Sequence, residues 1–392
     1  MTAGRHDARA LAGFAAALFA RAGLREDIAR DVADVLVEGD LLGHTTHGLA
    51  LAAPYLAELE RGSMTKTGEP VVVASRPAAQ TWDGGRLPGP WLTLRALDTA
   101  MGMASAQGTG TVVVRRSHHI ACLEAYLTRA TARGMMALVY SSDPVAASVA
   151  PFGAVSPVFT PNPLAAGIPT SGDPILIDVS ASYTTNSLTT RLYQAGERLP
   201  HAWVQDARGM PTDDPRVLFE EPKGTLLPLG GLEAGHKGYA LALMIEAMTA
   251  ALAGFGRADP KEGWGATVFV QALDPRAFGG LDAFARQMDW LVDACHGAAP
   301  REGVPRVRLP GERGLKLKRE QLERGVRHGQ QLEQLERQHR RRPAGHARRH
   351  GHAGHGHGRR RQHAHRGVQH RGDGRVRAAA YPQRVGRRLR VR

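Results

Sequence analysis

The sequence of 392 residues predicts an α/β fold of mixed helices and strands (α+β), and three observations support this fold class. Residues 1–62 have helical periodicity throughout, short β-rich runs begin after Gly62, and helical segments alternate with some of these runs. Hydrophobic residues make up 42% and charged residues 22% of the chain, an ordinary globular composition. No apolar run approaches the roughly 20 residues of a membrane span. A transmembrane protein and a small disulfide scaffold are both excluded.

The N-terminal region is expected to form three helices, one to about Ala22, one from about Arg25 to Leu42, and one from about Gly48 to Arg61. The apolar residues 11–20 follow Arg5 and Arg9 and could imitate a signal peptide. The amphipathic continuation to residue 36 fits two packed helices better.

Further along the chain, strands are predicted over residues 71–74, 111–114, 137–141, 175–179 and 267–273. Helices are predicted over residues 91–107, 120–133, 238–252 and 281–295. We therefore expect a helical segment over 1–70, an α/β domain over 71–225, and a mostly helical segment over 226–324 that packs on the N-terminal helices. A tail follows over 325–392.

The formal net charge of +14 is concentrated in that tail. Residues 325–392 hold 19 Arg and no Lys against three acidic residues, which leaves a net charge of −2 for residues 1–324. The tail also lacks Phe, Trp, Ile and Met, so it cannot build a core. Three interpretations stay open: a disordered nucleic-acid-binding arm, a His-rich metal-binding tail, and a stretch translated from a shifted reading frame that begins between Arg324 and Gln330. We favour the shifted frame and expect no nucleic-acid partner.

Cysteine usage indicates a reducing compartment, because Cys122 and Cys295 are the only two cysteines in the sequence. They provide neither a disulfide framework nor a metal-ligand spacing, so no metal site is expected. We expect a cytoplasmic protein without a membrane partner.

The first candidate for chemistry is the segment Gly43–Gly48, which holds two histidines and two threonines between predicted helices. The imidazole of His47 titrates near neutral pH and could donate or accept a proton, and the Thr46 hydroxyl could orient it. A histidine in a turn can equally serve as a cap or a packing residue.

Two further segments could bind a phosphate. Ser117-His118-His119 lies where a predicted strand ends and a predicted helix begins, although Ser117 could be a simple N-cap. Gly230–Gly238 carries His236 and Lys237 and runs into an apolar helix. It is not a P-loop, and no Gly-x-Gly-x-x-Gly is found between a strand and a helix, so a Rossmann site is not supported.

Taken in order, these segments resemble the malate/L-lactate dehydrogenase-like family of NAD(P)-dependent oxidoreductases over residues 8–324. The matching pieces are Gly43–Gly48, Ser117-His118-His119, Asn162-Pro163-Leu164, Ile177-Asp178, Gly235–Gly238, Asp274-Pro275 and Leu309–Glu312. The resemblance implies a helical domain plus a non-Rossmann α/β cofactor-binding domain. It also implies a homodimer with active sites near the subunit boundary.

The resemblance also implies roles for individual residues. His47 would be the proton donor, with Thr46 in place of the family's serine. The positions that would contact NAD or NADP are His118, His119, Ile120, Ala121, Cys122, Asp178, Val179, Ser180, His236, Lys237, Arg308, Pro310, Gly311, Glu312 and Arg313. The substrate would meet Asn162, Asn186 and Arg116.

The implied activity is hydride transfer between a 2-hydroxy acid and a 2-oxo acid, with the histidine as acid and base. The family commonly has an arginine four residues after this histidine to hold the substrate carboxylate, and here Leu51 occupies that position. A clamp would then come from Arg116 or Arg191, or the substrate would be a different one. Reduction of a cyclic ketimine is the alternative, but Leu188 replaces the aspartate of that branch.

Overall fold

The predicted N-terminal helices are confirmed by the computed structural model, which describes residues 4–328. They are α1 (Ala8–Arg21), α2 (Glu26–Leu41), the short 3-10 helix η1 (Leu49–Leu51) and α3 (Ala52–Arg61). The Asp7 side chain caps α1 by accepting a hydrogen bond from the Ala10 amide at 2.9 Å. Ile28, Val32 and Leu36 share one side of α2 and are buried, as the helical apolar period requires.

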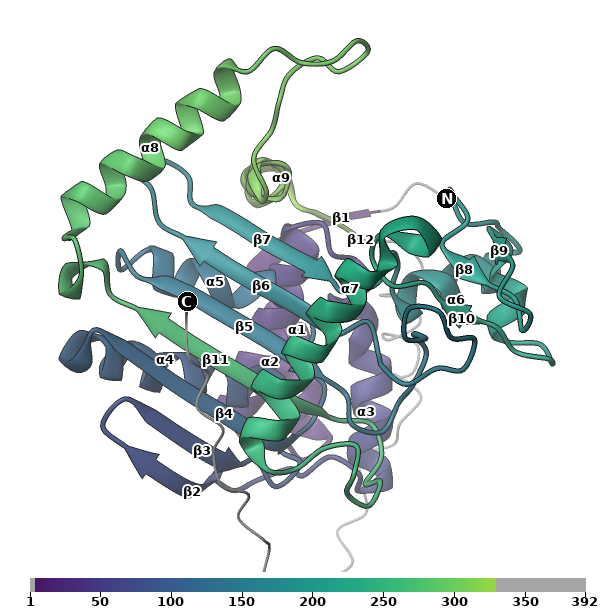
Figure 1. The fold of residues 1–392 in the computed structure, drawn as a ribbon. Helices are drawn as coiled ribbons and strands as arrows, with labels where there is room; N and C mark the ends of the chain where they lie inside the picture. Colours follow the sequence, from purple (N-terminus) through teal and green to yellow (C-terminus); the bar gives the residue numbers. More distant parts are fainter. Residues whose placement is uncertain (1–3, 329–392) are drawn as a thin grey trace, which may run out of the picture. The chain divides into compact units, whose positions relative to one another are not determined.

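A mixed seven-stranded sheet lies beside these helices (Figure 1). Its strands, in spatial order, are β2 (Val71–Arg76), β3 (Ala79–Asp83), β4 (Thr109–Ser117), β11 (Ala266–Leu273), β5 (Met136–Ser142), β6 (Pro163–Ile168) and β7 (Ile175–Ser180). Strands β3 and β4 run parallel, and the other neighbouring pairs are antiparallel. A doubly wound Rossmann sheet is parallel, so this topology agrees with the missing dinucleotide fingerprint.

Strand β11 joins the sheet from outside the range 71–225 that was predicted for the α/β domain. It pairs with β4 on one side and with β5 on the other. The sheet is therefore completed only by a segment from the predicted helical region 226–324. Strands β3 and β6 were not predicted, and β6 is rich in small residues that carry little β-strand signal.

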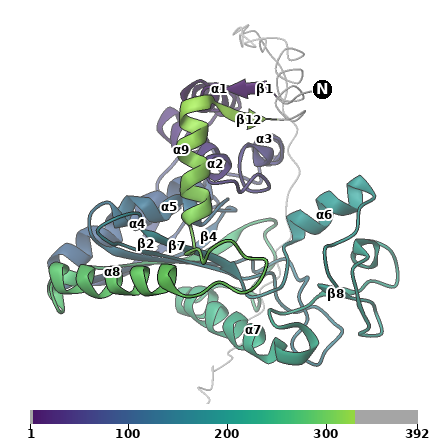
Figure 2. The same ribbon diagram turned by 90° about the horizontal axis from the view of Figure 1, so that it is seen from above.

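Helices cover both faces of the sheet, which Figure 2 views nearly edge-on. On one face α4 (Gly89–Gln107) packs on β4 and β11, α5 (Glu124–Thr131) packs on β6, and α2 packs against both helices. On the other face lies α7 (Gly231–Glu246), continued by a π-helical turn at Ala247–Ala251. Helix α4 approaches β4 so closely that a Cβ at Gly110 would lie 2.1 Å from the Ala100 carbonyl oxygen.

Two predicted helix starts are wrong, and both errors concern candidate binding segments. Helix α5 begins at Glu124 instead of residue 120, because the backbone at Ala121 is left-handed with φ 59°. His118 and His119 therefore lie in a connection and not at a helix N-terminus. Helix α7 begins at Gly231, with a kink at Ala234, so His236 and Lys237 lie inside a helix and not in a loop.

The remaining elements form a small lobe and a C-terminal return. They are α6 (Asn186–Ala195), β8 (Val204–Gln205), β9 (Pro211–Thr212), η2 (Pro215–Leu218), β10 (Thr225–Leu226), η4 (Pro275–Ala277), α8 (Leu281–Gly297), α9 (Glu312–Arg324) and β12 (Val326–His328). Helix α9 packs on α2 through Gln321, whose amide donates to the Asp40 and Leu41 carbonyls at 3.0 Å each.

Strand β12 covers the first described residues of the predicted tail. It pairs antiparallel with β1 (Gly4–His6), so this short part of the tail is ordered. The three interpretations of the tail depend on residues 329–392, which lie outside the described residues. Among residues 4–328, no helix combines the length and apolar character that a membrane crossing needs.

Candidate active site

The loop over residues 43–48 follows α2 and is fixed by Asp40, a buried carboxylate near the end of that helix. Its Oδ2 accepts a hydrogen bond from the Leu49 amide at 2.8 Å. Gly48 packs directly on this carboxylate, since a Cβ built at Gly48 would lie 2.1 Å from Oδ1 of Asp40. The loop therefore needs a residue without a side chain at position 48, and this requirement fixes the backbone next to His47.

The imidazole of His47 is held at one nitrogen and free at the other. Its Nδ1 lies 3.0 Å from Oγ1 of Thr46, and within residues 4–328 its Nε2 has no hydrogen-bond partner. Burial, followed by the nearby charge of His44, lowers the pKa of His47 to about 4, so the ring is neutral at pH 7. A hydroxyl can donate to Nδ1 or accept from it, so Thr46 supports both tautomers of the ring. The free nitrogen can therefore accept or donate a proton.

Aromatic rings surround His47 and its neighbour His119. The two imidazoles stack with centroids 5.9 Å apart and planes inclined by 24°. The Tyr55 hydroxyl lies 2.8 Å from Nδ1 of His119, and the Trp264 ring lies 4.7 Å from the His119 ring. His118 points elsewhere and places its Nε2 3.4 Å from Oε2 of Glu58. The pair His118-His119 thus divides into one histidine at the His47 site and one that is fully buried beside α3.

Acidification is expected to destabilise the fold through these buried histidines. Burial lowers the pKa of His118 to about 4 against the opposing Glu58 contact, and it lowers the pKa of His119 well below the ordinary value. Each ring binds a proton more readily in the unfolded chain, so its stabilising contribution is complete above about pH 6.5 and is lost as the pH falls toward about 4. For the fully buried His118 the loss is on the order of 3 kcal/mol.

Urea unfolding between about pH 7.5 and pH 5 measures this effect as a falling free energy of unfolding. A His118→Gln variant should show a shallower dependence on pH, since it removes one of the titrating rings. Stability that stays constant across this range would contradict the assignment of neutral buried histidines.

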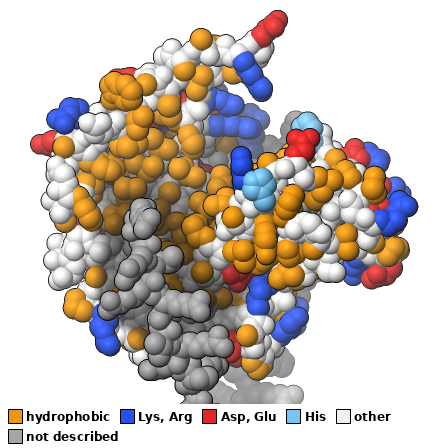
Figure 3. All heavy atoms as spheres, in the orientation of Figure 1, with side chains coloured by type: hydrophobic (Ala, Val, Ile, Leu, Met, Phe, Trp, Pro, Cys, Tyr) orange, Lys and Arg blue, Asp and Glu red, His pale blue; other side chains and the backbone are white. Residues whose placement is uncertain are grey.

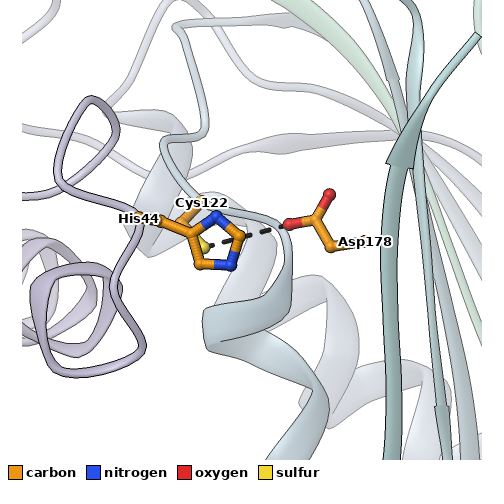
Figure 4. A group of neighbouring side chains, drawn as sticks. All are labelled: His44, Cys122 and Asp178. Carbon is orange, nitrogen blue, oxygen red and sulfur yellow. Dashed lines mark hydrogen bonds between the residues drawn. The ribbon is translucent and has the colours of Figure 1, made fainter. Parts of the chain in front are cut away.

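A second group of polar side chains consists of His44, which belongs to the loop over residues 43–48, together with Cys122 and Asp178 (Figure 4). Suitable ligand atoms of the three side chains all lie within 4.8 Å of one another. The Cys122 thiol donates to Oδ2 of Asp178 at 3.9 Å, and the Glu124 amide donates to the same oxygen at 3.0 Å. We call these three residues the His44 cluster.

Glu124 supports this cluster from α5. Its Oε2 lies 2.6 Å from Nε2 of His44. Burial disfavours the charged form of His44, but the contact with Glu124 and the charge of Asp178 outweigh burial and raise the pKa of His44. Burial also raises the pKa values of Cys122 and Asp178.

The predicted cofactor positions converge in part. His119 adjoins the His47 loop, and Cys122 belongs to the His44 cluster. Ile120 and Ala121, which lie between these two residues in the sequence, are buried. Asp178 comes from β7, whose last two residues differ in exposure: Val179 is exposed and Ser180 is partly buried. Segments 118–122 and 178–180 thus meet at one place, although they are far apart in the sequence.

The loop over residues 308–313 runs beside the beginning of β7. The Pro310 carbonyl accepts a hydrogen bond from the Leu176 amide at 3.2 Å, and Gly311 packs against Leu176. The Glu312 carboxylate accepts from the Leu309 amide at 3.1 Å and pairs with Arg306. It therefore fixes the start of α9. Arg308 and Arg313 are exposed, so their side chains are accessible to a ligand.

His236 and Lys237 project from the second turn of α7 and are exposed. The His236 ring contacts Phe152 with centroids 5.8 Å apart. Gly238, which follows Lys237, packs on the chain that follows β7, since a Cβ at Gly238 would lie 2.7 Å from the Ala181 carbonyl oxygen. Helix α7 thus brings these two side chains next to the end of the strand that carries Asp178.

The three predicted substrate positions lie in different surroundings. Asn162 is fully buried, and its amide accepts from the Thr160 hydroxyl at 2.7 Å and donates to Glu246 at 3.0 Å. This arrangement gives Asn162 a structural role, in contrast to the predicted substrate contact. Arg116 is similarly occupied by two carboxylates, Glu262 at 2.8 Å and Asp83 at 3.4 Å. Asn186 is exposed at the start of α6.

Sequence reasoning missed several residues of this site, namely Tyr55, Glu58, Glu124 and Trp264. Tyr55 and Glu58 lie on α3, and Trp264 lies on the connection before β11. Each belongs to a segment whose apolar or polar pattern explains it without a site, so no spacing signal was available. His44 lies in the segment Gly43–Gly48, but no sequence spacing links it to a cysteine and an aspartate more than 75 residues away.

Comparison with known proteins identifies relatives of this arrangement. Residues 6–336 match the family model described as malate/L-lactate dehydrogenase. L-lactate dehydrogenase from Cupriavidus necator is 32% identical over 296 residues, which cover 73% of this chain and 83% of that protein. The structure of malate dehydrogenase from Pyrococcus horikoshii OT3 has a TM-score of 0.78 at 25% identity and covers 86% of this chain and 95% of that one.

One structural relative carries a different reductase name. It is Δ1-piperideine-2-carboxylate reductase from Pseudomonas syringae pv. tomato, with a TM-score of 0.74 and 26% identity. The match covers 85% of this chain and 99% of that chain.

Proposed function

Because the chain belongs to the malate/L-lactate dehydrogenase family and is thus an oxidoreductase acting on CH–OH donors, we propose that it interconverts a 2-hydroxy acid and a 2-oxo acid with NAD or NADP. The observation that carries this proposal is the geometry of His47. Its ring is neutral, fixed at Nδ1 by Thr46 and free at Nε2. The two free cysteine thiols suit a cytoplasmic location.

His47 performs the proton transfer in both directions. A bound nicotinamide would supply hydride chemistry at the carbon that carries the substrate oxygen. During oxidation, Nε2 of neutral His47 takes the proton of the substrate hydroxyl, and during reduction the protonated ring returns it to the carbonyl oxygen. Thr46 keeps its contact with Nδ1 throughout, because Nδ1 carries a proton in both the neutral base and the protonated ring and donates it to Oγ1 of Thr46 in each.

The groups around His47 fit a dinucleotide by their chemistry. Asp178 and Glu124 offer carboxylates for ribose hydroxyls, and Oε1 of Glu124 is buried without a hydrogen-bond partner among the described residues. Lys237 and His236 would meet the diphosphate, and Arg308 and Arg313 add exposed cationic side chains. Residues 119–122 would hold the cofactor beside the His47 loop, whereas His118, a predicted cofactor contact, points away from it toward Glu58.

Arg191 would supply the carboxylate clamp that the family's arginine provides elsewhere. Leu51, which stands at that arginine's position, is 8% exposed and packs in the core. Arg116 is occupied by two carboxylates, whereas Arg191 reaches from α6 to the His47 loop, where its Nη1 lies 3.5 Å from Oγ1 of Thr45. Within residues 4–328 Arg191 has no carboxylate partner, so its charge is free for a substrate.

Replacing Arg191 with alanine is therefore expected to raise the KM for the 2-oxo acid about 10- to 100-fold, since a hydrogen bond to a charged group contributes about 1.5–3 kcal/mol. Cofactor affinity should stay unchanged. Steady-state kinetics with varied 2-oxo acid checks this, and Arg208→Ala is the matched control because Arg208 is exposed elsewhere in the same lobe. An unchanged KM in Arg191→Ala would remove Arg191 from the site.

A homodimer is the assembly that the exposed apolar side chains favour. Large apolar residues that are 41–67% exposed lie on α7, after it, and around α8: Leu243, Met244, Leu252, Phe278, Trp290 and Leu291. Figure 3 shows apolar side chains gathered over the sheet face between these two helices. Sedimentation should give twice the mass of one chain, and Trp290→Arg should shift it toward the monomer.

Cyclic ketimine reduction is the second candidate, and the Pseudomonas syringae reductase is the observation that favours it. Leu188, where that branch has an aspartate, argues against it. One assay decides between the two: consumption of NADH or NADPH with a panel of 2-oxo acids and cyclic ketimines. Turnover of 2-oxo acids supports the main proposal, and turnover of ketimines alone overturns it.

A further inference from the structure

We propose that the His44 cluster binds a divalent cation of the zinc type, and that this cation and the nicotinamide cofactor exclude each other. The three side chains come from the loop after α2, from the connection between β4 and α5, and from β7. Figure 4 shows the imidazole, the thiol and the carboxylate facing one another. They form a mixed nitrogen, sulfur and oxygen donor set. No local spacing in the sequence predicts it, because the three residues lie far apart along the chain.

The distances are close to those that one ion requires. Zinc binds thiolate, imidazole and carboxylate ligands at about 2.0–2.3 Å, so the ligand atoms of a tetrahedral site lie about 3.6 Å apart. Cys122 Sγ and Asp178 Oδ2 are 3.9 Å apart, and all three ligand atoms lie within 4.8 Å of one another. Side-chain shifts of about 1 Å would therefore complete a three-ligand site with an open fourth position.

Glu124 already orients two of the three ligands. It holds Nε2 of His44 at 2.6 Å, which is the carboxylate–histidine contact that accompanies metal-bound imidazoles. Within the described residues the other ring nitrogen, Nδ1, makes no hydrogen bond and is free to coordinate. The Glu124 amide also fixes Oδ2 of Asp178. The cluster is thus positioned before any ion arrives.

The donor set selects the class of ion. A thiolate and an imidazole favour zinc or cobalt over magnesium or calcium, which prefer oxygen ligands. Binding converts the Cys122 thiol to a thiolate, and its proton leaves to the solvent. The exclusion of the cofactor rests on the proposed function, in which Cys122 and Asp178 contact the dinucleotide.

Cobalt(II) is the probe, because a cobalt–thiolate bond gives an intense charge-transfer band in the near ultraviolet. The chain has two cysteines, so two variants assign the band. Titration of the metal-free full-length protein should produce the band in the wild type and in Cys295→Ser, the matched control, but not in Cys122→Ser. His44→Gln and Asp178→Asn should each weaken cobalt binding at least about tenfold. Histidines elsewhere in the chain cannot produce a thiolate band.

The cobalt band can contradict the proposed ion site in two ways. A missing band in the wild type, or a band that persists in Cys122→Ser, would overturn the site. If Cys122→Ser does not fold by circular dichroism, cobalt affinity in Asp178→Asn decides instead, and unchanged affinity would overturn the site.

Addition of NADH or NADPH to the cobalt-loaded protein should abolish the visible d–d bands of the bound cobalt, which are followed because the reduced nicotinamide itself absorbs in the near ultraviolet. A band that remains while nicotinamide fluorescence reports bound cofactor would overturn the exclusion and leave the ion site supported. If the metal-free protein binds neither nucleotide, the exclusion fails together with the proposed function, and the band alone supports the ion site.

Discussion

Replacing His47 with asparagine is expected to lower kcat by about 10²- to 10⁴-fold in both reaction directions, the usual range for losing a general acid–base group. Asparagine keeps a polar side chain next to Thr46 but cannot carry a proton to or from the substrate oxygen. Cofactor affinity should change little, because the predicted cofactor contacts lie on other segments. Steady-state kinetics with a 2-oxo acid, together with nucleotide titration, measures the two effects separately.

Two further variants test whether the loss of turnover is specific to His47. His201→Asn changes an exposed histidine on a turn of the small lobe and should leave kcat unchanged. Thr46→Val removes the contact with Nδ1 and should lower kcat by a smaller factor than His47→Asn, with an altered pH profile. A His47→Asn enzyme with wild-type turnover would show that another group transfers the proton.

Gly48→Ala is expected to abolish turnover and to lower the free energy of unfolding by about 3 kcal/mol. The new Cβ would lie 2.1 Å from Oδ1 of Asp40, so the buried carboxylate would have to move. Asp40 would then lose its hydrogen bond from the Leu49 amide, and the loop that carries His47 would lose its anchor. Denaturant unfolding and kinetics on the same preparation test both consequences.

Gly102→Ala provides the matched control for this substitution. Gly102 lies inside α4, and a Cβ there would meet nothing within 4 Å. Alanine should therefore stabilise the protein by about 0.5–1 kcal/mol through its helix propensity and leave turnover unchanged. Wild-type stability and activity in Gly48→Ala would contradict the role assigned to the Asp40 contact.

The helices were predictable from the sequence because their apolar period is local. Ile28, Val32 and Leu36 identify the buried face of α2 without any knowledge of what covers it. The start of α5 was not predictable in this way, since the apolar residues 120–123 fit a helix equally well. The left-handed backbone at Ala121 ends that possibility in the structure, and alanine gives no signal of such a conformation.

The candidate site was predictable only where a short motif carries it. The segment Gly43–Gly48 led to His47 through its resemblance to a family loop, and the structure adds Asp40 as the reason for Gly48. The segment with Asn162 also resembles the family, yet the Asn162 amide, just before β6, donates to Glu246 on α7. A motif therefore locates a segment but does not decide whether each side chain faces a ligand or the core.

Residues that act through packing left no signal at all. Trp264 reaches His119 only because β11 inserts between β4 and β5, a pairing over more than 120 residues that sequence periodicity does not encode. Glu124 meets His44 for a similar reason, since α5 packs against α2.

Fluorescence titration of the full-length protein with NADH and NADPH, followed by addition of 2-oxo acids, tests the central claim most directly. We expect saturable binding of at least one nucleotide, weaker binding in His236→Ala and Lys237→Ala, and oxidation of the bound nucleotide only when a 2-oxo acid is present. Absence of binding by both nucleotides would contradict the claim that this chain is a nicotinamide-dependent dehydrogenase with His47 as its acid and base.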